Sequence, residues 1–286
     1  MRLPIRPLIA RWPGWLEKRA NRLFWPDPAA LLTDDVDPDL FRTIMSQVYI
    51  GGTIKITGAN RHPEADDLLV RNVDVTGMAI ADIGASDGST SLDLMEKLPD
   101  FGSFTIADLH LKISAVRVGH RWVFFDVDGA CVMISGRRTV AWPGQSGWVH
   151  AACLPTIRKA VKLSASGRDV QLINPAVRRR MAEDSRISTK IHDVFTVWPD
   201  PKPDVIKVAN LLRRLYFPDD RLLEGLNALT TSLPEGGHLL IAENPRSGDL
   251  THRGGLYRRA GGKLIVVAQT DPEPELAPMI DLATAI

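Results

Sequence analysis

Residues Met78–Gly88, MAIADIGASDG, contain the clearest structural signal in this sequence. An apolar run carries one aspartate, Asp82, and breaks into small residues between Gly84 and Gly88. A Ser-Thr-Ser sequence and a helical pattern follow, so the stretch predicts a strand, a tight turn and the start of a helix. Glycines allow a sharp turn and a close approach of a ligand to main-chain N–H groups, and the positive end of the helix points at the same place. We therefore expect a cofactor at this turn.

A second apolar segment, residues 102–108, ends in an acid, Asp108, which lies twenty residues after Gly88. Neighbouring parallel strands place their carboxyl ends side by side over one crevice, so an acid there can hold both hydroxyl groups of a ribose. Two such hydrogen bonds contribute about 1.5–3 kcal/mol, and an exposed surface acid contributes nothing comparable. The two segments together predict a nucleoside site more strongly than either does alone.

These residues resemble the first motif of the class I S-adenosylmethionine-dependent methyltransferases, an acid, a variable residue and spaced glycines. The matching positions are Asp82, Gly84, Ser86 and Gly88, with serine where the family more often has glycine. Later segments are similar to the family's third, fourth and fifth strands with their flanking turns, in the same order: residues 187–195, 203–220 and 233–241. The resemblance spans roughly residues 76–245. It implies an α/β fold with a doubly wound, mostly parallel seven-stranded sheet.

The resemblance also implies where S-adenosylmethionine binds. Its methionine end would lie over the first turn, its ribose on Asp108 and its adenine against residues 193–194. The implied cofactor-binding set is Asp82, Gly84, Ala85, Ser86, Gly88, Asp108, Leu109, Asp193, Val194 and Asn210.

Three residues are implied as catalytic candidates. Asn210 and Tyr216 fall where the family approaches the transferring methyl group, and His110, just past the second strand, is the nearest base. A structural role stays open for each: Asn210 capping its turn, Tyr216 in the core, His110 in solvent.

The implied reaction is methyl transfer to an oxygen or nitrogen atom of a small-molecule acceptor. A site of this kind accelerates an in-line displacement mainly by proximity and orientation, so a dedicated base is optional. A non-catalytic cofactor-binding or scaffold protein of the same fold is the second hypothesis.

Two other motifs suggest different enzymes. Residues 84–88 also match the nucleophile elbow of serine hydrolases, with Ser86 as nucleophile and Asp219 followed by His238 or His252 as partners. That hypothesis leaves Asp82, Asp108 and the later motifs without a role. Residues 122–130, WVFFDVDGA, imitate a phosphatase motif, but an Asp-Gly hairpin turn explains them better.

Composition limits the function further. With 286 residues, 44% hydrophobic and 24% charged, the chain is typical of a globular protein. Its net charge of +1 argues against a general nucleic-acid binder. Two cysteines, Cys131 and Cys153, form neither a disulfide framework nor a four-cysteine zinc site, so we expect reduced thiols in a cytoplasmic protein and no metal. We also expect neither a signal peptide nor a membrane span.

Short β-rich runs between residues 115 and 142, separated by Gly-containing turns, predict a β-meander inserted after the second strand, which could contact substrate or form a homodimer. A hairpin around Gly261 and Gly262 should close the main sheet, and the acidic, proline-rich tail from Asp271 should be peripheral. We therefore divide the chain into an N-terminal helical arm or lid (1–72), a Rossmann-like cofactor-binding domain (73–110 and 171–270), the insertion (111–170) and a C-terminal tail (271–286).

The first 27 residues interleave basic and apolar side chains, including Trp12, Trp15 and Trp25. Such a stretch can lie on an anionic membrane surface, which makes peripheral membrane contact one hypothesis. We favour an arm packed on the protein, because Pro4, Pro7 and Pro13 shorten any helix. Helices should start at Pro38 and Pro63, and the next should follow Asn174.

Overall fold

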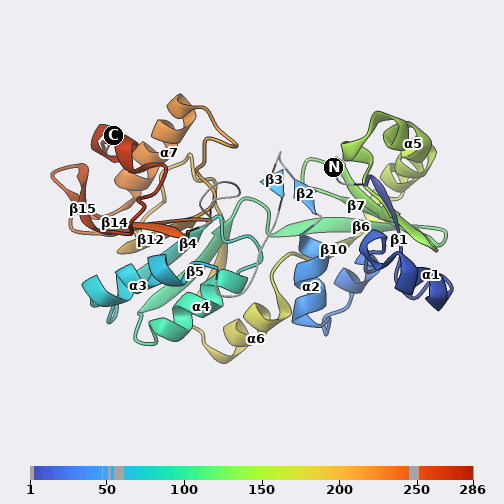
Figure 1. Cartoon of the computed structure of the whole chain (residues 1–286), viewed down its shortest axis with the longest axis horizontal. Helices are drawn as coiled ribbons and strands as arrows, with labels where there is room; N and C mark the ends of the chain where they lie inside the picture. The colour runs from blue at the N-terminus through green and yellow to red at the C-terminus, as the bar shows by residue number, and fades with distance from the viewer. Residues whose placement is uncertain (1–2, 47, 51–52, 55–60, 245–250, 286) are drawn as a thin grey trace. The chain divides into compact units, whose positions relative to one another are not determined.

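The computed structural model describes residues 3–46, 48–50, 53–54, 61–244 and 251–285 (Figure 1). The chain forms two compact units, each built from two separate stretches of sequence. Unit 1 comprises Met1–Thr57 and His110–Ala176, and unit 2 comprises Gly58–Leu109 and Val177–Ile286.

Unit 2 is built on a seven-stranded sheet in the order β11-β5-β4-β12-β13-β14-β15. The strands are β4 (Ala79–Ile83), β5 (Ser103–Asp108), β11 (Ile187–Ile191), β12 (Val205–Ala209), β13 (His238–Glu243), β14 (Arg253–Ala260) and β15 (Lys263–Gln269). The first five in this order run parallel, and β14 pairs antiparallel with both of its neighbours. The sheet is therefore mixed, and the predicted closing hairpin is confirmed as β14 and β15.

Helices cover both faces of this sheet, which makes it doubly wound. They are α3 (Pro63–Asn72), α4 (Ser89–Lys97), α6 (Pro175–Glu183) and α7 (Asp219–Ser232). Alternation along β12 sets the two faces: Ile206 and Val208 pack with Leu226 of α7, whereas Lys207 between them reaches Asp66 of α3. Because both faces are covered, the central strands β4, β12 and β13 are almost continuously buried, whereas β11 at the edge is mostly exposed.

The strand order fixes where a ligand can bind. From β4 the chain continues to β5 and then β11 on one side, and it returns to β12 on the other side of β4. The carboxyl ends of β4 and β12 therefore flank the point at which the strand order reverses. Doubly wound folds bind their ligands in the crevice at such a switch point.

Unit 1 contains a six-stranded antiparallel sheet in the order β1-β9-β8-β7-β6-β10. The strands are β1 (Ile5–Pro7), β6 (Lys112–Val118), β7 (Arg121–Phe125), β8 (Cys131–Ser135), β9 (Thr139–Ala141) and β10 (Arg168–Gln171), and the short pair β2 (Tyr49–Ile50) and β3 (Thr53–Ile54) forms a separate ribbon. The helices are α1 (Gly14–Arg19), α2 (Pro38–Met45) and α5 (Gly147–Lys162), with 3₁₀ turns η1 (Asn21–Leu23), η2 (Pro28–Leu32), η3 (Pro143–Gln145) and η4 (Ser164–Ser166). The meander predicted after the second main strand is confirmed as β6 to β9.

The N-terminal segment differs from the helical arm expected over residues 1–72. Strand β1 pairs with β9 of the insertion, and Leu8 and Phe24 are buried. Prolines suit this outcome, since they interrupt helices but are accepted on an edge strand such as β1. Residues 1–57 therefore belong with the inserted sheet, whereas α3 belongs to unit 2. In the structure the N-terminal arm packs on the protein, which is the alternative that we favoured.

Helix starts follow the sequence closely. Asp37 accepts the N–H groups of Asp39 and Leu40 at the start of α2, and Asn174 accepts the N–H of Ala176 at the start of α6. The sequence pattern predicts that the helix from Pro38 continues until Gly51 and Gly52 stop it. Those two glycines lie outside the described residues, and α2 ends at Met45.

The prediction of a peripheral C-terminal tail is wrong. Met279 and Ile280, in the 3₁₀ turn η5 (Ala277–Leu282), are 6% and 1% exposed and pack into the core beside α7. The side chain of Glu243, at the end of β13, accepts the N–H of Glu275 at 2.7 Å. The apolar residues of this tail are spaced among prolines, so the sequence shows neither helical nor strand periodicity there. In the structure they nevertheless pack on one face of the sheet. Within the described residues, no helix has both the length and the apolar character needed to cross a bilayer.

The tail should therefore contribute to stability. Replacing Ile280 with alanine removes buried methyl groups and leaves a cavity, which should lower the free energy of unfolding of the chain by about 2–4 kcal/mol. Leu282, 61% exposed in the same turn, is the matched control, and Leu282→Ala should change stability by about 0.5 kcal/mol or less. Urea unfolding of both variants checks this, and equal effects would contradict the packing of the tail.

Candidate functional site

The turn between β4 and α4 is held in a conformation that suits glycine. Gly84, Ser86 and Gly88 have φ values of +76°, +60° and +77°. A Cβ atom on Gly84 would lie 2.5 Å from a methyl carbon of Leu211, in the loop after β12. The positive φ therefore favours glycine at this position, and any larger residue would also have to displace the Leu211 side chain.

The N–H groups of this turn bond within the protein. Gly84 and Ala85 donate to the carbonyl of Ala107, Ser86 donates to Asp108, Gly88 donates to the carbonyl of Ala85, and Ser89 donates to the side chain of Asp87. The expectation that these main-chain donors face a ligand is thus wrong for five of them. A phosphate would compete with those internal bonds, so the turn suits a ligand without one.

Asp108, predicted from its spacing, lies at the end of β5 and is 9% exposed. Its Oδ2 accepts the N–H of Ser86 at 2.8 Å, which ties the end of β5 to the turn after β4. The next residue, Leu109, leaves 47% of its surface exposed at the same strand end. Together these two residues can bind a flat group: the Asp108 carboxylate would accept hydrogen bonds from its polar edge, and the Leu109 side chain would contact its apolar face.

Asp82 is buried beneath the turn. Its Oδ2 accepts the hydroxyl of Ser91 at 2.7 Å, and within the described chain Oδ1 has no hydrogen-bond partner. Burial raises the pKa of Asp82 to about 6, while the nearby Lys207 acts in the opposite direction. Asp82 is thus an incompletely satisfied acid at the end of the first strand.

Sequence reasoning missed the cation below this acid. Lys207 of β12 is fully buried, and its Nζ lies 2.6 Å from Oδ1 of Asp66 on α3. Burial raises the pKa of Asp66, and Lys207 opposes that shift. A single lysine inside the apolar run Val205–Ala209 was the signal, since an unpaired lysine is almost never placed in a buried strand.

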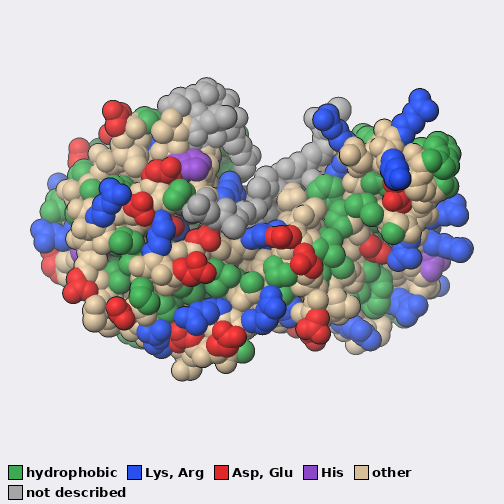
Figure 2. Space-filling view, turned by 60° about the horizontal axis from the view of Figure 1, so that its bottom comes forward, with side chains coloured by type: hydrophobic (Ala, Val, Ile, Leu, Met, Phe, Trp, Pro, Cys, Tyr) green, Lys and Arg blue, Asp and Glu red, His purple; other side chains and the backbone are tan. Residues whose placement is uncertain are grey.

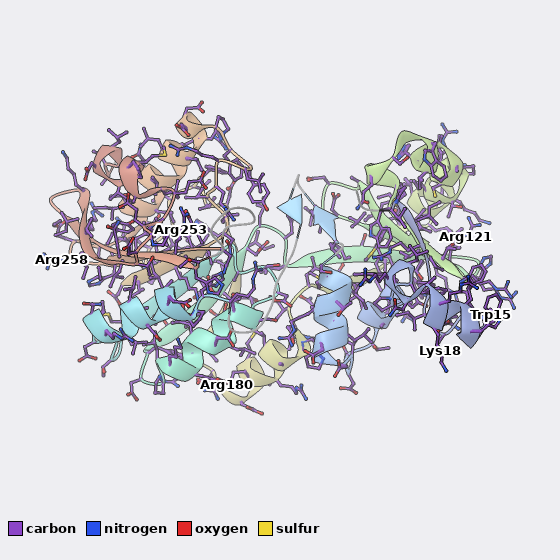
Figure 3. The ribbon with its side chains drawn as sticks, in the orientation of Figure 1. Trp15, Lys18, Arg121, Arg180, Arg253 and Arg258 are labelled. Atoms are coloured by element: carbon purple, nitrogen blue, oxygen red, sulfur yellow. The ribbon has the colours of Figure 1, made fainter. Side chains whose placement is uncertain are left out.

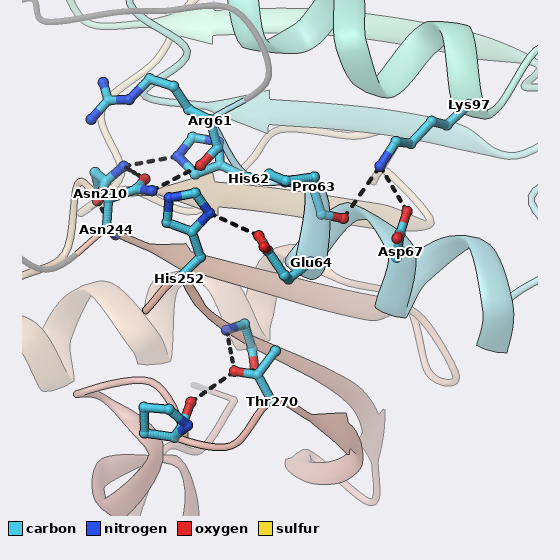
Figure 4. Close-up of polar contacts among 12 residues, drawn as sticks. Arg61, His62, Pro63, Glu64, Asp67, Lys97, Asn210, Asn244, His252 and Thr270 are labelled. Atoms are coloured by element: carbon cyan, nitrogen blue, oxygen red, sulfur yellow. Dashed lines mark hydrogen bonds and ion pairs between the residues drawn. The ribbon is translucent and has the colours of Figure 1, made fainter. Parts of the chain in front are cut away.

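A second polar group lies at the carboxyl ends of β12 and β13 (Figure 4). Asn210, with φ of +55°, follows β12, and Asn244 follows β13. Asn210 Nδ2 lies 2.8 Å from His62 Nε2 and 2.7 Å from Asn244 Oδ1, and Asn210 Oδ1 lies 2.7 Å from Asn244 N. His62 immediately precedes α3, so three elements of unit 2 meet here.

These contacts determine the tautomer of His62. A main-chain N–H can only donate, so the oxygen of the Asn210 amide must face Asn244 N and its nitrogen must face His62. His62 Nε2 therefore accepts, and the proton of the neutral ring is on Nδ1. That nitrogen is buried and has no partner among the described residues.

The environment keeps His62 neutral. Burial, followed by the charges of Lys207 and Arg61, holds the pKa of His62 well below its ordinary value of 6.5. A neutral ring with Nδ1–H offers one hydrogen-bond donor and no free base. His62 was not among the predicted site residues, because a lone histidine before a helix has no distinctive spacing.

Among the catalytic candidates, Asn210 is the one that this network contains, and its amide is committed to His62 and Asn244. Within the described chain, its side-chain hydrogen bonds are with these two residues and not with its own turn. Tyr216 lies in the loop before α7 and makes an edge contact with Phe217, with ring centroids 6.4 Å apart. His110 is 8% exposed and is the first residue of the second stretch of unit 1; the expectation of a solvated His110 is wrong.

The two predicted adenine residues follow β11. Asp193 Oδ1 accepts the N–H of Phe195 at 3.1 Å, so this acid shapes its own turn. Val194 is 5% exposed and packs in the core with α7. The neighbouring His192 donates its N–H to the Asp108 carbonyl at 3.2 Å, which places this turn beside the acid at the end of β5.

The geometry does not support the two alternative enzymes. The Ser86 hydroxyl has no hydrogen-bond partner in the described chain, His238 lies at the opposite, amino-terminal end of β13, and His252 bonds to Glu64. A serine nucleophile requires a base within hydrogen-bond reach. Asp126 accepts the N–H groups of Asp128 and Ala130, as the hairpin interpretation predicts.

Comparison with known proteins gives matches among solved structures, while no protein-family profile and no curated protein sequence matches the chain. Similar structures include the S-adenosylmethionine-dependent methyltransferase SibL (16% identity, 66% of this chain, 38% of that one, TM-score 0.33), the mitomycin 7-O-methyltransferase MmcR (16%, 77%, 44%, 0.35) and the magnesium protoporphyrin IX methyltransferase of Synechocystis PCC 6803 (11%, 65%, 55%, 0.35). The chain thus spans 38–55% of these proteins.

The buried ion pair should be sensitive to loss of one partner. Asp66→Ala leaves the Lys207 charge buried without its carboxylate and should lower the free energy of unfolding by about 3–5 kcal/mol. Asp67, 42% exposed on the same helix and paired with Lys97, is the control, and Asp67→Ala should cost about 1 kcal/mol or less. Urea titrations of both variants test this; similar losses would mean that Lys207 is not buried as described.

His62 should make stability depend on pH. Its folded-state pKa lies below that of the unfolded chain, so only the unfolded state gains a proton as the pH falls below about 6.5. Stability from this group is complete above that pH and declines below it, with a slope approaching about 1.4 kcal/mol per pH unit.

The His62→Gln variant removes this contribution and keeps an acceptor for Asn210. The difference in unfolding free energy between wild type and this variant should therefore change between pH 7.5 and pH 5.5. The acids Asp66 and Asp82 are present in both proteins, so their opposite contribution cancels. A difference that is constant with pH would mean that His62 titrates normally.

Proposed function

We propose that the chain is an S-adenosylmethionine-dependent methyltransferase acting on an oxygen or nitrogen nucleophile of a small molecule. The observation that carries this proposal is the Asp108 carboxylate, fixed by the N–H of Ser86 from the neighbouring turn. It puts an oriented acid at the carboxyl edge of a doubly wound sheet, beside the switch point where such folds bind nucleosides.

The residues present fit this cofactor. A carboxylate has about four acceptor positions on its two oxygens, and the bond from Ser86 uses one of them while it orients Asp108. The internally bonded N–H groups of the turn disfavour a dinucleotide, whose pyrophosphate needs such donors. The orphaned Oδ1 of Asp82 supplies an acceptor close to the turn.

We assign the parts of the cofactor to the set that the sequence motifs imply. The turn residues with Asp82 would hold the methionine end, Asp108 and Leu109 the ribose, and Asp193 with Val194 the adenine. S-adenosylmethionine, when bound, supplies an electrophilic methyl group carried on a sulfonium sulfur.

The chain's own contribution is positioning. Asn210 is fixed by His62 and Asn244 at the end of β12, so the loop that follows it has a defined start. A neutral His62 adds no positive charge beside a cationic cofactor. Alignment of donor and acceptor is the main source of acceleration in such a displacement. His110 and Tyr216 remain predictions as base and acceptor contact.

Cofactor binding tests the proposal. Asp108→Ala should weaken binding of S-adenosylmethionine, measured by isothermal titration calorimetry, by about 10- to 100-fold, because a charged acceptor for two hydroxyls is lost. Asp108→Asn should weaken it nearly as much while unfolding closer to wild type, since an amide oxygen can still accept the N–H of Ser86 but its nitrogen can only donate.

The exposed acid Asp220, at the start of α7, is the control, and Asp220→Asn should bind as wild type does. Undetectable binding by wild type, or equal binding by both Asp108 variants and wild type, would contradict the assignment. Incubation with radiolabelled cofactor and fractionated cell extract separates the two hypotheses: transfer to a small-molecule fraction supports an enzyme, whereas binding without transfer supports the scaffold alternative.

A further inference from the structure

Unit 1 carries an arginine-lined cavity far in sequence from every residue discussed for the cofactor. The cavity has a volume of about 400 Å³ and is lined by Ala10, Arg11, Trp12, Pro13, Arg137 and Arg138. Three of these lining residues are arginines, and they come from two segments, the turn before α1 and the β8–β9 hairpin. Guanidinium groups present a planar fork of donors that matches phosphate oxygens.

Contacts within unit 1 hold the cavity in shape but leave its charge largely uncompensated. Trp12 Nε1 donates to the Arg138 carbonyl at 2.9 Å, and the Arg138 guanidinium lies 5.5 Å from the centre of the Trp12 ring. Arg11 reaches Asp27 at 3.4 Å but keeps 54% of its side chain exposed. Arg137 has no ion-pair partner among the described residues.

Exposed apolar side chains flank the cavity in sequence on both sides of the turn. Ile9 is 48% exposed, and Trp15, in the first turn of α1, is 68% exposed. Lys18 and Arg19, later in the same short helix, are also exposed. Figure 3 shows Trp15 and Lys18 pointing away from the ribbon of this unit, and Figure 2 shows many basic side chains on its surface.

We propose that this surface, defined as the arginine cavity with Ile9, Trp15 and Lys18, docks on a bilayer by binding the phosphate headgroups of anionic lipids. Charge complementarity favours the headgroups, and a tryptophan with an exposed aliphatic neighbour is suited to the interface between headgroups and acyl chains. Single-stranded nucleic acid would use the same charges and stack on the tryptophan, but it would gain nothing from Ile9. The proposal does not depend on the methyltransferase assignment.

Co-sedimentation of the full chain with vesicles tests this proposal. Vesicles of phosphatidylcholine with 30% phosphatidylglycerol should pellet the protein, and pure phosphatidylcholine vesicles should not. Replacing Arg11, Arg137 and Arg138 together by glutamine should weaken partitioning by about 100-fold, at roughly fivefold for each charge near the surface. Trp15→Ala should weaken it by about tenfold, because its ring no longer enters the interface.

The charge-matched control replaces Arg158, Lys159 and Lys162, exposed on α5 of the same unit, by glutamine. It should bind nearly as wild type does, and thermal unfolding should show that all variants are folded. Equal losses for the two triple variants, binding unaffected by Trp15→Ala, or no binding to anionic vesicles would each overturn the proposal. Displacement by inorganic phosphate alone would assign the cavity to a soluble anion, and displacement by an oligonucleotide at equal phosphate concentration would assign it to nucleic acid; either result would also overturn it.

Discussion

The hydrogen bond from the Ser86 N–H to the Asp108 carboxylate is the contact on which the proposed site depends. It joins the turn after β4 to the end of β5, and Ser86 makes it from a left-handed conformation in a turn that also contains Gly84 and Gly88. The Asp108 side chain is held at the edge of the sheet with little freedom, so binding of a ligand would cost little conformational entropy at this residue. The same bond withdraws one main-chain donor from the ligand, which separates this turn from a phosphate-binding loop.

Beneath that turn, Asp66, Lys207 and Asp82 place two acids and one base in the interior of unit 2. An interior ion pair rarely stabilises a fold more than apolar packing would, because desolvation opposes the attraction. The arrangement is easier to understand as a constraint on α3. Asp66 fixes the helix against β12, and the start of the same helix carries His62 to Asn210. The Lys207 ion pair below the first turn and the His62 contact with Asn210 are therefore linked through α3.

The parts of the fold that could be predicted from sequence are those set by local rules. Spaced glycines, an acid at a strand end and proline or Asx helix starts each reflect one turn of backbone, so Gly84, Asp108 and Asp37 were found directly. Pairing between distant segments leaves no such mark. Strand β1 meets β9 across more than 130 residues of sequence, Asn244 meets Asn210 from the neighbouring strand 34 residues away, and Met279 enters a core that the sheet shares with α7. These contacts depend on tertiary packing, which overrides local propensity.

Net charge illustrates the same limit for function. The total of +1 argued against a general nucleic-acid binder, but that total averages over a chain whose first 25 residues hold six basic side chains and one acid. Folding concentrates the contrast further, because the hairpin that carries Arg137 and Arg138 lies against the turn that carries Arg11 and Trp12. Fields at a surface decay within about 8–10 Å at physiological salt, so a partner responds to this local group and not to the sum over the molecule. The net charge of a chain therefore indicates only which partners its surface as a whole would bind. A single arginine-lined cavity can still bind an anion.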